Sequence, residues 1–592
     1  MRELEYPFDS KRIITKKLRY RRLLLHDGSQ RIPKKIAILG GSTTNDVRNC
    51  IELFLLNYGI EPEFYESEYN QFYEDALFPP QELLDFHPDI IYIYTTSRNI
   101  LGFPSLNDSA EKIIRQNLSD EIHRFTSVWQ NLKKVFNCPI IQNNFEKPPY
   151  RLMGNKDVSD IHGKLHFISC LNQKIYEYSQ QNADFYVCDI DYISADYGLT
   201  RWHDAQNWYM YKYAMSLPAI PYLAFNVANI IKSIFGKNKK GFVLDLDNTL
   251  WGGVIGERGP DRIVLGPENA EGQAYLEFQQ YLKEHKQLGV LLNIDSKNDM
   301  ENAIAGLKHP DGVLKPEDMI VIEANWEPKD RNFVEIANDL SLLPESLVFI
   351  DDNPAEREIV RQQLPGVVAP EIGHVEDYIR VIDRSGFFEA TTLSADDEKR
   401  NQMYKENIAR ASLQAKFENY AEYLMSLEMK STIHPFEPVL IPRIAQLTNK
   451  SNQFNLTTRR YTQEEIENVS HDPSYIDLYA RLVDRFGDNG VVSVIIGHQH
   501  GPLCEIDLWL MSCRVLKRDL EYACMDEFMR LCSERGIQIV RGYYYPTAKN
   551  AMVRDFYGLH GFRRVKRGTF YTVWEIKVKE YVPKNKVISV NE

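Results

Sequence analysis

The sequence lacks a long apolar run and any close pair of cysteines. Across its 592 residues no stretch approaches the ~18–20 uninterrupted apolar residues of a membrane span. The basic segment 1–25 also lacks the apolar block of a targeting peptide. The eight cysteines stand singly, without a CxxC pair, which excludes a zinc ribbon and fits reduced thiols. We therefore expect a cytoplasmic protein that does not insert into a membrane.

An excess of positive charge is missing as well. The formal net charge of −13 makes nucleic acid an improbable partner for the chain as a whole. The composition, with 43% hydrophobic and 26% charged residues and no low-complexity tract, is that of an ordinary globular protein. At roughly 150 residues per domain, the length predicts three or four domains.

Alternating apolar runs and helical stretches predict an α/β multidomain chain. Apolar runs such as KKIAILGG and DIIYIYTT, each followed by helical sequence, are typical of a parallel, doubly wound sheet. The last part is richer in strands and is predicted to be α+β. The predicted segments are an N-terminal arm at 1–33, a doubly wound domain at 34–235, a second α/β domain at 241–380, a helical connector at 381–430 and the α+β domain at 431–592.

The stretch GFVLDLDNTLWGG at 241–253 carries the strongest chemical signal. Its apolar run ends in two carboxylates, Asp245 and Asp247, where a buried strand of an α/β sheet would meet solvent. One carboxylate there can attack phosphorus and form an aspartyl-phosphate, and the second can shuttle the leaving-group proton. Taken alone, the pattern is also compatible with two surface acids in a loop.

Three further strand ends of the second domain carry residues of complementary chemistry. Ser296 can donate its hydroxyl to a phosphate oxygen, and Lys329 can neutralise phosphate charge. Asp351 and Asp352 can complete a Mg²⁺ site with Asp245, because hard oxygen ligands suit this ion. The alternative is that these residues are unrelated surface side chains. It would require residues of complementary chemistry to occur by chance at all four strand ends.

The order and spacing of these motifs resemble the haloacid dehalogenase (HAD) superfamily, and GFVLDLDNTLWGGVIGERG, IDSKND, NWEPKDRN and FIDDNPAERE resemble its FkbH-like branch (subfamily IIIC). The resemblance implies a HAD-like Rossmannoid domain, 1,3-bisphosphoglycerate as a phosphorylated three-carbon substrate, and a glyceryl group carried on an acyl carrier protein. It implies Mg²⁺ bound at Asp245, Asp247, Asp351 and Asp352. The implied phosphate-binding residues are Thr249, Ser296, Lys297, Asn298 and Lys329.

The C-terminal segment offers a candidate nucleophile, Cys513. NKSNQFNLTTRRY, WLMSCRVLKRDLE and KNAMVRDFYGLHGF resemble the acyltransferase-like (GNAT-like) unit usually joined to this HAD branch. Cys513 follows an apolar strand and precedes a predicted helix, where a helix N-terminus and neighbouring cations would lower the thiol pKa. The alternative is a small buried cysteine.

The residues after Cys513 bear on the acyl donor and acceptor. RVLKRD contains no glycine where GNAT domains usually have a pyrophosphate loop, so a carrier-borne phosphopantetheine thiol is expected rather than coenzyme A. Arg514, Lys517 and Arg518, with Arg459 and Arg460, are predicted to supply a basic patch for an acidic carrier. A solvated charged face is the alternative reading.

ILGGST at 38–43 resembles the first block of SGNH hydrolases, with Ser42 as the nucleophile. Asn99 would lie near an oxyanion hole, and His203 would be the base. The usual acid before that histidine is replaced by Thr200, so Asp204 or Asp196 would have to substitute. Docking of a partner is an equally good interpretation of this domain.

We therefore predict an enzyme that transfers a glyceryl unit from 1,3-bisphosphoglycerate to an acyl carrier protein. The transfer would include dephosphorylation and use an aspartyl-phosphate at Asp245 and a thioester at Cys513. Two alternatives remain. One is a Mg²⁺-dependent phosphatase acting on a small acyl or sugar phosphate without carrier transfer. The other is a non-catalytic assembly protein. The receiving pathway, polyketide or polysaccharide biosynthesis, is left open.

Overall fold

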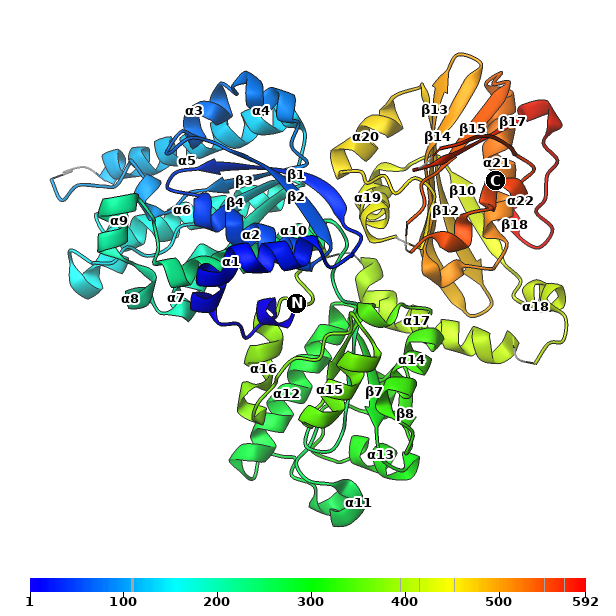
Figure 1. The fold of residues 1–592 in the computed structure, drawn as a ribbon, viewed down its shortest axis with the longest axis horizontal. Coiled ribbons are helices and arrows are strands. Elements are labelled where there is room, and N and C mark those ends of the chain that lie inside the picture. Colours follow the sequence, from blue (N-terminus) through cyan, green and yellow to red (C-terminus); the bar gives the residue numbers. More distant parts are fainter. Residues whose placement is uncertain are drawn as a thin grey trace. The chain divides into compact units, whose positions relative to one another are not determined.

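The computed structural model describes residues 1–107, 111–393, 395–414, 416–451, 453–547, 549–568 and 570–591. The chain forms two compact units, Met1–Ile234 and Phe235–Glu592 (Figure 1). The second unit holds two sheets. All three sheets have helices packed on them, and the predicted α/β and α+β classes are confirmed.

The first unit is a doubly wound α/β domain. Its five strands are all parallel and follow the order β2-β1-β3-β4-β5. The central strands are buried on both faces, as expected for a parallel sheet. The strand bounds are β1 Ile32–Gly40, β2 Ile60–Glu66, β3 Ile90–Tyr94, β4 Ile140–Asn143 and β5 Phe185–Cys188.

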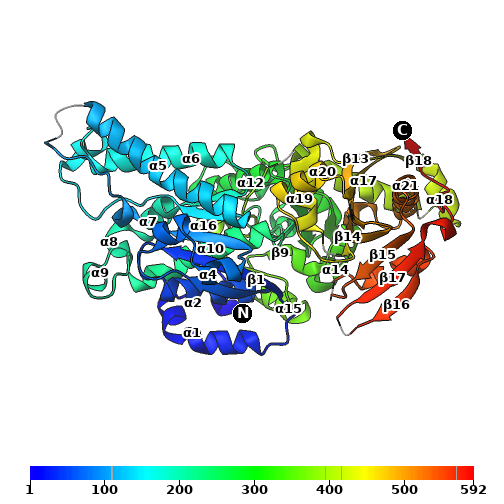
Figure 2. The same ribbon diagram turned by 90° about the horizontal axis from the view of Figure 1, so that it is seen from above.

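Helices cover both faces of this sheet. Ala37 and Leu39 face a cluster that includes Phe125 and Trp129 of α5 and residues of α6, on the side of the sheet opposite α1 and α2 (Figure 2). The helix bounds are α1 Ser10–Leu25, α2 Asn45–Asn57, α3 Phe72–Leu77, α4 Gln81–Phe86, α5 Glu111–Phe136, α6 Lys164–Gln181, α7 Ile190–Tyr197, α8 Leu199–Trp202, α9 Ala205–Tyr211 and α10 Ile220–Ile234.

The N-terminal segment differs from the predicted separate arm at 1–33. Helix α1 packs on α2, burying Ile13, Tyr20 and Leu24, and Arg21 Nε pairs with Glu52 Oε1 at 2.8 Å. Basic residues of this segment thus meet acidic residues of α2. Among the described residues one helical stretch, Leu217–Ile234, is long and apolar enough to cross a membrane, and 72% of it is buried in the fold. Its packing on α2 makes it a core helix.

The first sheet of the second unit has four parallel strands in the order β8-β7-β6-β9. Side chains alternate between two hydrophobic clusters. Phe242 and Leu244 face α12 and α16, whereas Val243 faces α14 and α15. The bounds are β6 Gly241–Leu244, β7 Leu291–Ser296, β8 Ile322–Ala324, β9 Leu347–Ile350, α11 Ile255–Arg258, α12 Ala270–Gln287, α13 Met300–Leu307, α14 Lys329–Asp339, α15 Pro354–Gln363 and α16 Val375–Arg384.

The second sheet of this unit is mixed, in the order β16-β17-β15-β14-β13-β12-β10-β18, with β11 paired to β14. The strands are β10 Lys430–His434, β11 Phe454–Asn455, β12 Tyr475–Asp484, β13 Gly487–His500, β14 Leu503–Met511, β15 Ile539–Tyr544, β16 Arg563–Arg567, β17 Thr572–Lys577 and β18 Ser589–Asn591. The helices are α17 Ala395–Gln414, α18 Tyr420–Ser426, α19 Ile441–Lys450, α20 Gln463–His471, α21 Leu520–Glu534 and α22 Phe556–Leu559.

Strands β14 and β15 pair only over their first residues, Leu503–Ile506 with Ile539–Gly542. Beyond that point the segment around β11 bridges them. Leu456 N donates to the carbonyl of Trp509 (3.0 Å), and Leu456 O accepts from Tyr545 N (2.9 Å). The fully buried Asn550 donates its Nδ2 to the carbonyl of Asn455 (2.9 Å). Two motifs singled out in the sequence, NKSNQFNLTTRRY and KNAMVRDFYGLHGF, therefore meet in the core of this sheet.

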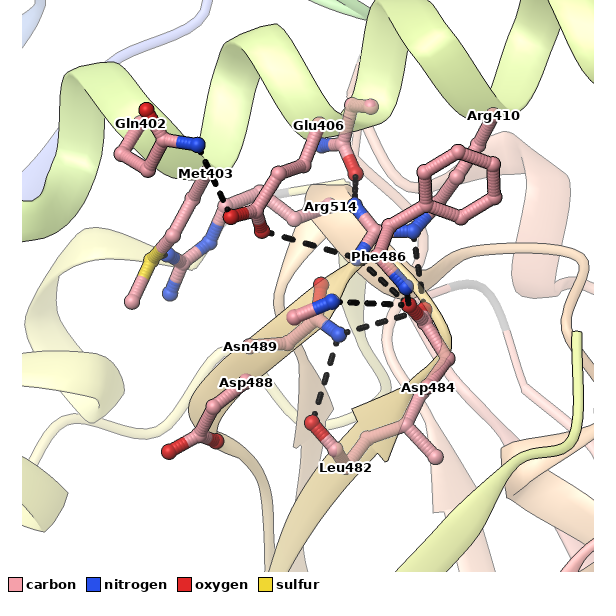
Figure 3. Close-up of polar contacts among 12 residues, drawn as sticks. Gln402, Met403, Glu406, Arg410, Leu482, Asp484, Phe486, Asp488, Asn489 and Arg514 are labelled. Atoms are coloured by element: carbon pink, nitrogen blue, oxygen red, sulfur yellow. Dashed lines mark hydrogen bonds and ion pairs between the residues drawn. The ribbon is translucent and has the colours of Figure 1, made fainter.

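The connector helix α17 lies against the second sheet through buried charges (Figure 3). Arg410 makes two hydrogen bonds to Asp484, Nε to Oδ2 at 2.8 Å and Nη2 to Oδ1 at 2.7 Å. Arg518 Nη1 adds a contact to Asp484 Oδ2 at 3.1 Å. The side chains of Arg410 and Asp484 are 2% and 0% exposed. Such pairs lose much stability when one partner is removed, because the other charge stays buried.

Replacing Asp484 by Asn should therefore destabilise the second unit by about 3–5 kcal/mol, because two buried guanidinium groups lose their carboxylate. The matched control is Asp488→Asn in the same hairpin. Asp488 pairs with the half-exposed Arg481, so its loss should cost less than about 1 kcal/mol. Urea unfolding of the full chain measures both, and equal midpoints for the two variants would contradict the buried-pair argument.

Candidate active site

The turn after β6 places the two predicted carboxylates. Asp245 continues the pairing with β9, donating its N–H to the carbonyl of Ile350 (2.9 Å). Asn248 then takes a left-handed conformation (φ 57°). Its side-chain oxygen accepts from Gly253 N at 2.7 Å. This tight turn keeps both Asp245 and Asp247 at the carboxyl edge of the sheet, where α/β proteins bind ligands.

Lys329, the first residue of α14, holds two of these carboxylates together. Its Nζ donates to Asp245 Oδ1 at 2.7 Å and to Asp351 Oδ2 at 2.5 Å. The three side chains are 4%, 9% and 0% exposed. Burial alone would lower the pKa of Lys329, but Asp245 and Asp351 raise it above its ordinary value. Lys329 is therefore a permanent cation beside the predicted nucleophile.

Among the described residues, Asp245, Asp351 and Asp352 form a group that could hold a metal ion, since one oxygen of each lies within 4.8 Å of the others. Burial, and then Asp245, raise the pKa of Asp351 to about 7 and raise that of Asp352. Carboxylates crowded in this way fit a divalent cation with hard oxygen ligands, such as Mg²⁺. The side chain of Asp247, which we also predicted as a metal ligand, is outside this group and bonded elsewhere.

Asp247 is oriented by three donors. Its Oδ1 accepts from Trp251 Nε1 (2.9 Å) and Ile255 N (3.1 Å). Its Oδ2 accepts from Asn298 Nδ2 (3.1 Å). Burial raises the pKa of Asp247 despite these hydrogen bonds, and Asp245 raises it further. A raised pKa suits a group that first gives a proton to a leaving oxygen and later takes one from water.

The remaining predicted phosphate-binding residues lie around the same edge. Ser296 ends β7 and is buried. Thr249 Oγ1 accepts from Asp352 N (3.2 Å), and Asn298 bonds to Asp247 as described. Lys297 Nζ pairs with Glu356 Oε1 at 2.6 Å. The structure thus gathers at one sheet edge the residues that the sequence analysis assigned to the HAD site.

Sequence reasoning missed two supporting side chains. Asp295, fully buried directly before Ser296, accepts from Asn332 Nδ2 (3.1 Å), and burial raises its pKa to about 8. Arg357 donates to the carbonyls of Asp351 (2.6 Å) and Asp352 (2.8 Å) and so fixes their loop. Two signals in the sequence could have revealed them. Asp295 is an acid inside an apolar strand, and Arg357 lies in the first turn of the helix that follows DDNP.

The predicted N-terminal triad is not assembled. Asn99 Nδ2 donates to the carbonyl of Gly41, next to Ser42, at 2.8 Å. The Nε2 of His203, however, contacts the carbonyl of Lys147 at 2.9 Å. Both carboxylate oxygens of Asp204 accept from Asn207, and the buried Nδ1 of His203 has no hydrogen-bond partner among the described residues. Ser42 itself is 2% exposed. The described contacts therefore bring Asn99 to the Ser42 turn, and no hydrogen bond joins His203 to Ser42 among the described residues.

Cys513 lies in a different setting from the one predicted. It begins a 3₁₀ helix of three residues, and α21 starts only at Leu520, after left-handed residues at Lys517 and Asp519. The helix N-terminal field expected at Cys513 is therefore missing. Its side chain is partly buried against a hydrophobic cluster of the first sheet and interacts with Tyr404 of α17.

The predicted basic patch is also corrected. Arg514 and Arg518 are 9% and 7% exposed. Arg514 contacts the Met403 sulfur, and Arg518 belongs to the Asp484 network. Neither guanidinium can face a carrier protein in this conformation. Lys517 is exposed, and Arg459 is half exposed in a pair with Asp507.

Comparisons with known proteins agree with this geometry. Residues 35–232 match the family model of the FkbH N-terminal domain. The crystal structure of the N-terminal part of BF1531 from Bacteroides fragilis, which contains a phosphatase domain complexed with Mg, has a TM-score of 0.59 and 29% identity. The match covers 64% of this chain and 99% of that one. The resemblance to FkbH-like proteins is confirmed. With the Asp245–Lys329–Asp351 constellation, it supports a phosphatase-type activity.

Two further solved structures each match about a quarter of the chain. They are the ribosomal-protein-S18-alanine N-acetyltransferase of Escherichia coli (TM-score 0.21, 12% identity, 94% of that chain) and Ard1 of Thermoplasma volcanium (TM-score 0.21, 22% identity, 97% of that chain). Each match covers 25% of this chain. No curated protein matches the sequence.

Removing the buried cation tests the charge balance of the site. Lys329→Met should lower stability by about 3–5 kcal/mol in EDTA, because Asp245 and Asp351 then face each other unpaired. Added Mg²⁺ should recover part of this loss by binding the folded state. Thermal unfolding with and without MgCl₂ measures both effects. Lys283→Met, which removes a half-exposed lysine of the same domain, is the control. Wild-type stability of Lys329→Met in EDTA would refute the argument.

Proposed function

We propose that this chain is a Mg²⁺-dependent phosphatase of the HAD type whose substrate is a phosphorylated three-carbon acyl compound. The observation that carries the proposal is the buried bridge of Lys329 between Asp245 and Asp351, with Asp352 beside it. Intact catalytic geometry of this kind argues against a purely non-catalytic assembly role. The similarity to the Mg-complexed phosphatase domain of BF1531 supports the choice of metal.

The proposed reaction has two steps. One oxygen of Asp245 attacks the phosphorus, the bond from phosphorus to the substrate oxygen breaks, and Asp247 gives its proton to that oxygen. Water then attacks the aspartyl-phosphate, Asp247 takes a proton from it, and phosphate leaves with regeneration of Asp245. Lys329 and the hydroxyls of Thr249 and Ser296 would bind phosphoryl oxygens. A Mg²⁺ ion at Asp245, Asp351 and Asp352 would offset the negative charge.

We further propose that the glyceryl group passes from 1,3-bisphosphoglycerate to an acyl carrier protein in the cytoplasm. The Cys513 thiolate would attack the acyl carbon, release the 1-phosphate and form a 3-phosphoglyceryl thioester, from which the Asp245 site would remove the 3-phosphate. The phosphopantetheine thiol of the carrier would then displace Cys513. The resemblance of the motifs around Cys513 to acyltransferase-like units supports this part. Of the predicted carrier-binding cations, Lys517 and Arg459 remain exposed for contact.

A phosphatase without carrier transfer is the second candidate. Cys513 lacks the helix N-terminus that would activate it, and Arg514 is buried against α17. Both observations favour a structural cysteine at the contact between the two halves of the second unit.

The nucleophile is tested by Asp245→Asn. An amide cannot attack phosphorus, so phosphate release should fall by at least about 10³-fold, as should release by the wild type after removal of Mg²⁺. Phosphate released from 3-phosphoglycerate is the measurement, and a matched circular dichroism spectrum shows that the fold is kept. Asp339→Asn, at the exposed C-terminal end of α14, is a control outside the metal group. Turnover by Asp245→Asn at the wild-type rate would exclude the assignment.

Cys513→Ser separates the two candidate functions. Serine is nearly isosteric, but its far higher pKa makes it a poor nucleophile toward an acyl phosphate. If transfer uses the thioester, the variant should load no carrier and still release phosphate at the Asp245 site. Intact mass of the carrier protein, with wild type and variant in parallel, is the measurement. Loading by Cys513→Ser at the wild-type rate would favour direct attack by the pantetheine thiol.

A further inference from the structure

An ion pair joins the segments that follow two strands of the candidate active site. Strands β7 and β9 are the two neighbours of β6 in the sheet. Lys297 follows the end of β7, and Glu356 lies on α15, just after β9. Their side chains meet at 2.6 Å between Nζ and Oε1. Because adjacent strands lie about 4.8 Å apart, the pair must pass over the end of β6, where Asp245 begins the catalytic turn.

The loop that carries Lys297 is fixed by the two residues that follow Lys297. Asn298 Nδ2 donates to Asp247 Oδ2 (3.1 Å), and Asp299 Oδ1 accepts from Trp326 Nε1 (3.0 Å). The Lys297 side chain, in contrast, is 39% exposed and has a long, flexible stem. It is therefore the part of the loop that can change partner without moving the backbone.

The pair with Glu356 is partly open to solvent, because the Lys297 side chain is 39% exposed and that of Glu356 is 13% exposed. Such a partly solvated pair contributes on the order of 1 kcal/mol, so a second anion of the substrate can take the place of Glu356. Lys329 already bridges Asp245 and Asp351, and it lies at the catalytic turn. A second cation over the end of β6 is then placed for a second negative group on the same substrate.

We propose that Lys297 is a specificity residue that leaves Glu356 to bind a second anionic group of the substrate, a carboxylate or an acyl phosphate, while the phosphoryl group lies at Asp245. This inference rests on the proposed function. Glu356 has the complementary role: it holds Lys297 in place when no substrate is bound, and it repels substrate anions when Lys297 is removed. The preferred class is a short phosphomonoester with a second anion, as in a three-carbon phosphorylated acid.

The test compares 3-phosphoglycerate with glycerol 3-phosphate, which replaces the carboxylate by a neutral hydroxymethyl group. The full-length protein with Mg²⁺ is used, and the ratio of kcat/KM for the two substrates is the readout. Lys297→Met should lower this ratio about tenfold or more, because a charge-assisted hydrogen bond is lost. Glu356→Gln should raise it about twofold by freeing Lys297. The ratio for the double variant should lie between those of Lys297→Met and the wild type, because the unpaired carboxylate of Glu356 no longer repels the substrate anion.

Glu358→Gln is the matched control. Glu358 lies on the same helix and pairs with Arg361, so its removal changes the charge of α15 without touching Lys297. An unchanged ratio in Lys297→Met would overturn the proposal, because Lys297 would then act on the phosphoryl group or have no part in binding. If the wild type turns over neither compound, the proposed function fails on its own. In that case, the affinities of the wild type and of Lys297→Met for the two compounds are compared by calorimetry. A preference of the wild type for 3-phosphoglycerate that is lost in Lys297→Met would support the role of Lys297, and equal preferences would contradict it.

Discussion

The contact between Lys329 and two carboxylates is the interaction on which the candidate site depends. Lys329 is separated by 84 residues from Asp245 and by 22 from Asp351, yet one ammonium group contacts both. Without a cation at this point, acids buried at the ends of β6 and β9 would repel each other. Lys329 is held there because α14 packs its Phe333 and Ile336 against the sheet. Helix packing in the core therefore fixes the charge balance of the site.

Much of the fold could be predicted from local pattern. The buried strands β1, β3, β4, β6, β7 and β9 are short apolar runs, and a parallel sheet brings their carboxyl ends to one edge. Strand β2, with the sequence IEPEFYE, was missed because this edge strand carries acids and Pro62 and is only partly buried. In the stretch KNAMVRDFYGLHGF, Phe556–Leu559 forms a short α-helix of four residues. Here Asn550 bonds to the distant Asn455, a contact that no local pattern contains.

The region after Cys513 shows where local reasoning fails. The run RVLKRD reads as a solvated basic segment, but the partners of Arg514 and Arg518 lie 111 and 34 residues away. Likewise, the apolar strand before Cys513 and the helical sequence after it suggested a direct strand-to-helix step. The chain inserts a turn with two left-handed residues, Lys517 and Asp519, instead. Burial of an arginine and the conformation of such a turn are decided by tertiary contacts, which the sequence pattern does not report.

The helix α17 has a consequence for how this protein can be divided. Its first half bonds to the phosphatase-like half, with Asn401 Nδ2 donating to the carbonyl of Lys286 (2.9 Å) and Tyr404 buried in the cluster beside the first sheet. A few residues later, Arg410 enters the Asp484 network of the second sheet (Figure 3). A cut anywhere between these residues exposes buried surface of one half or leaves a buried charge unpaired in the other. The two halves therefore share one structural element. A chimera that joins either half to an unrelated domain would have to keep α17 and the surfaces of both halves that α17 packs on.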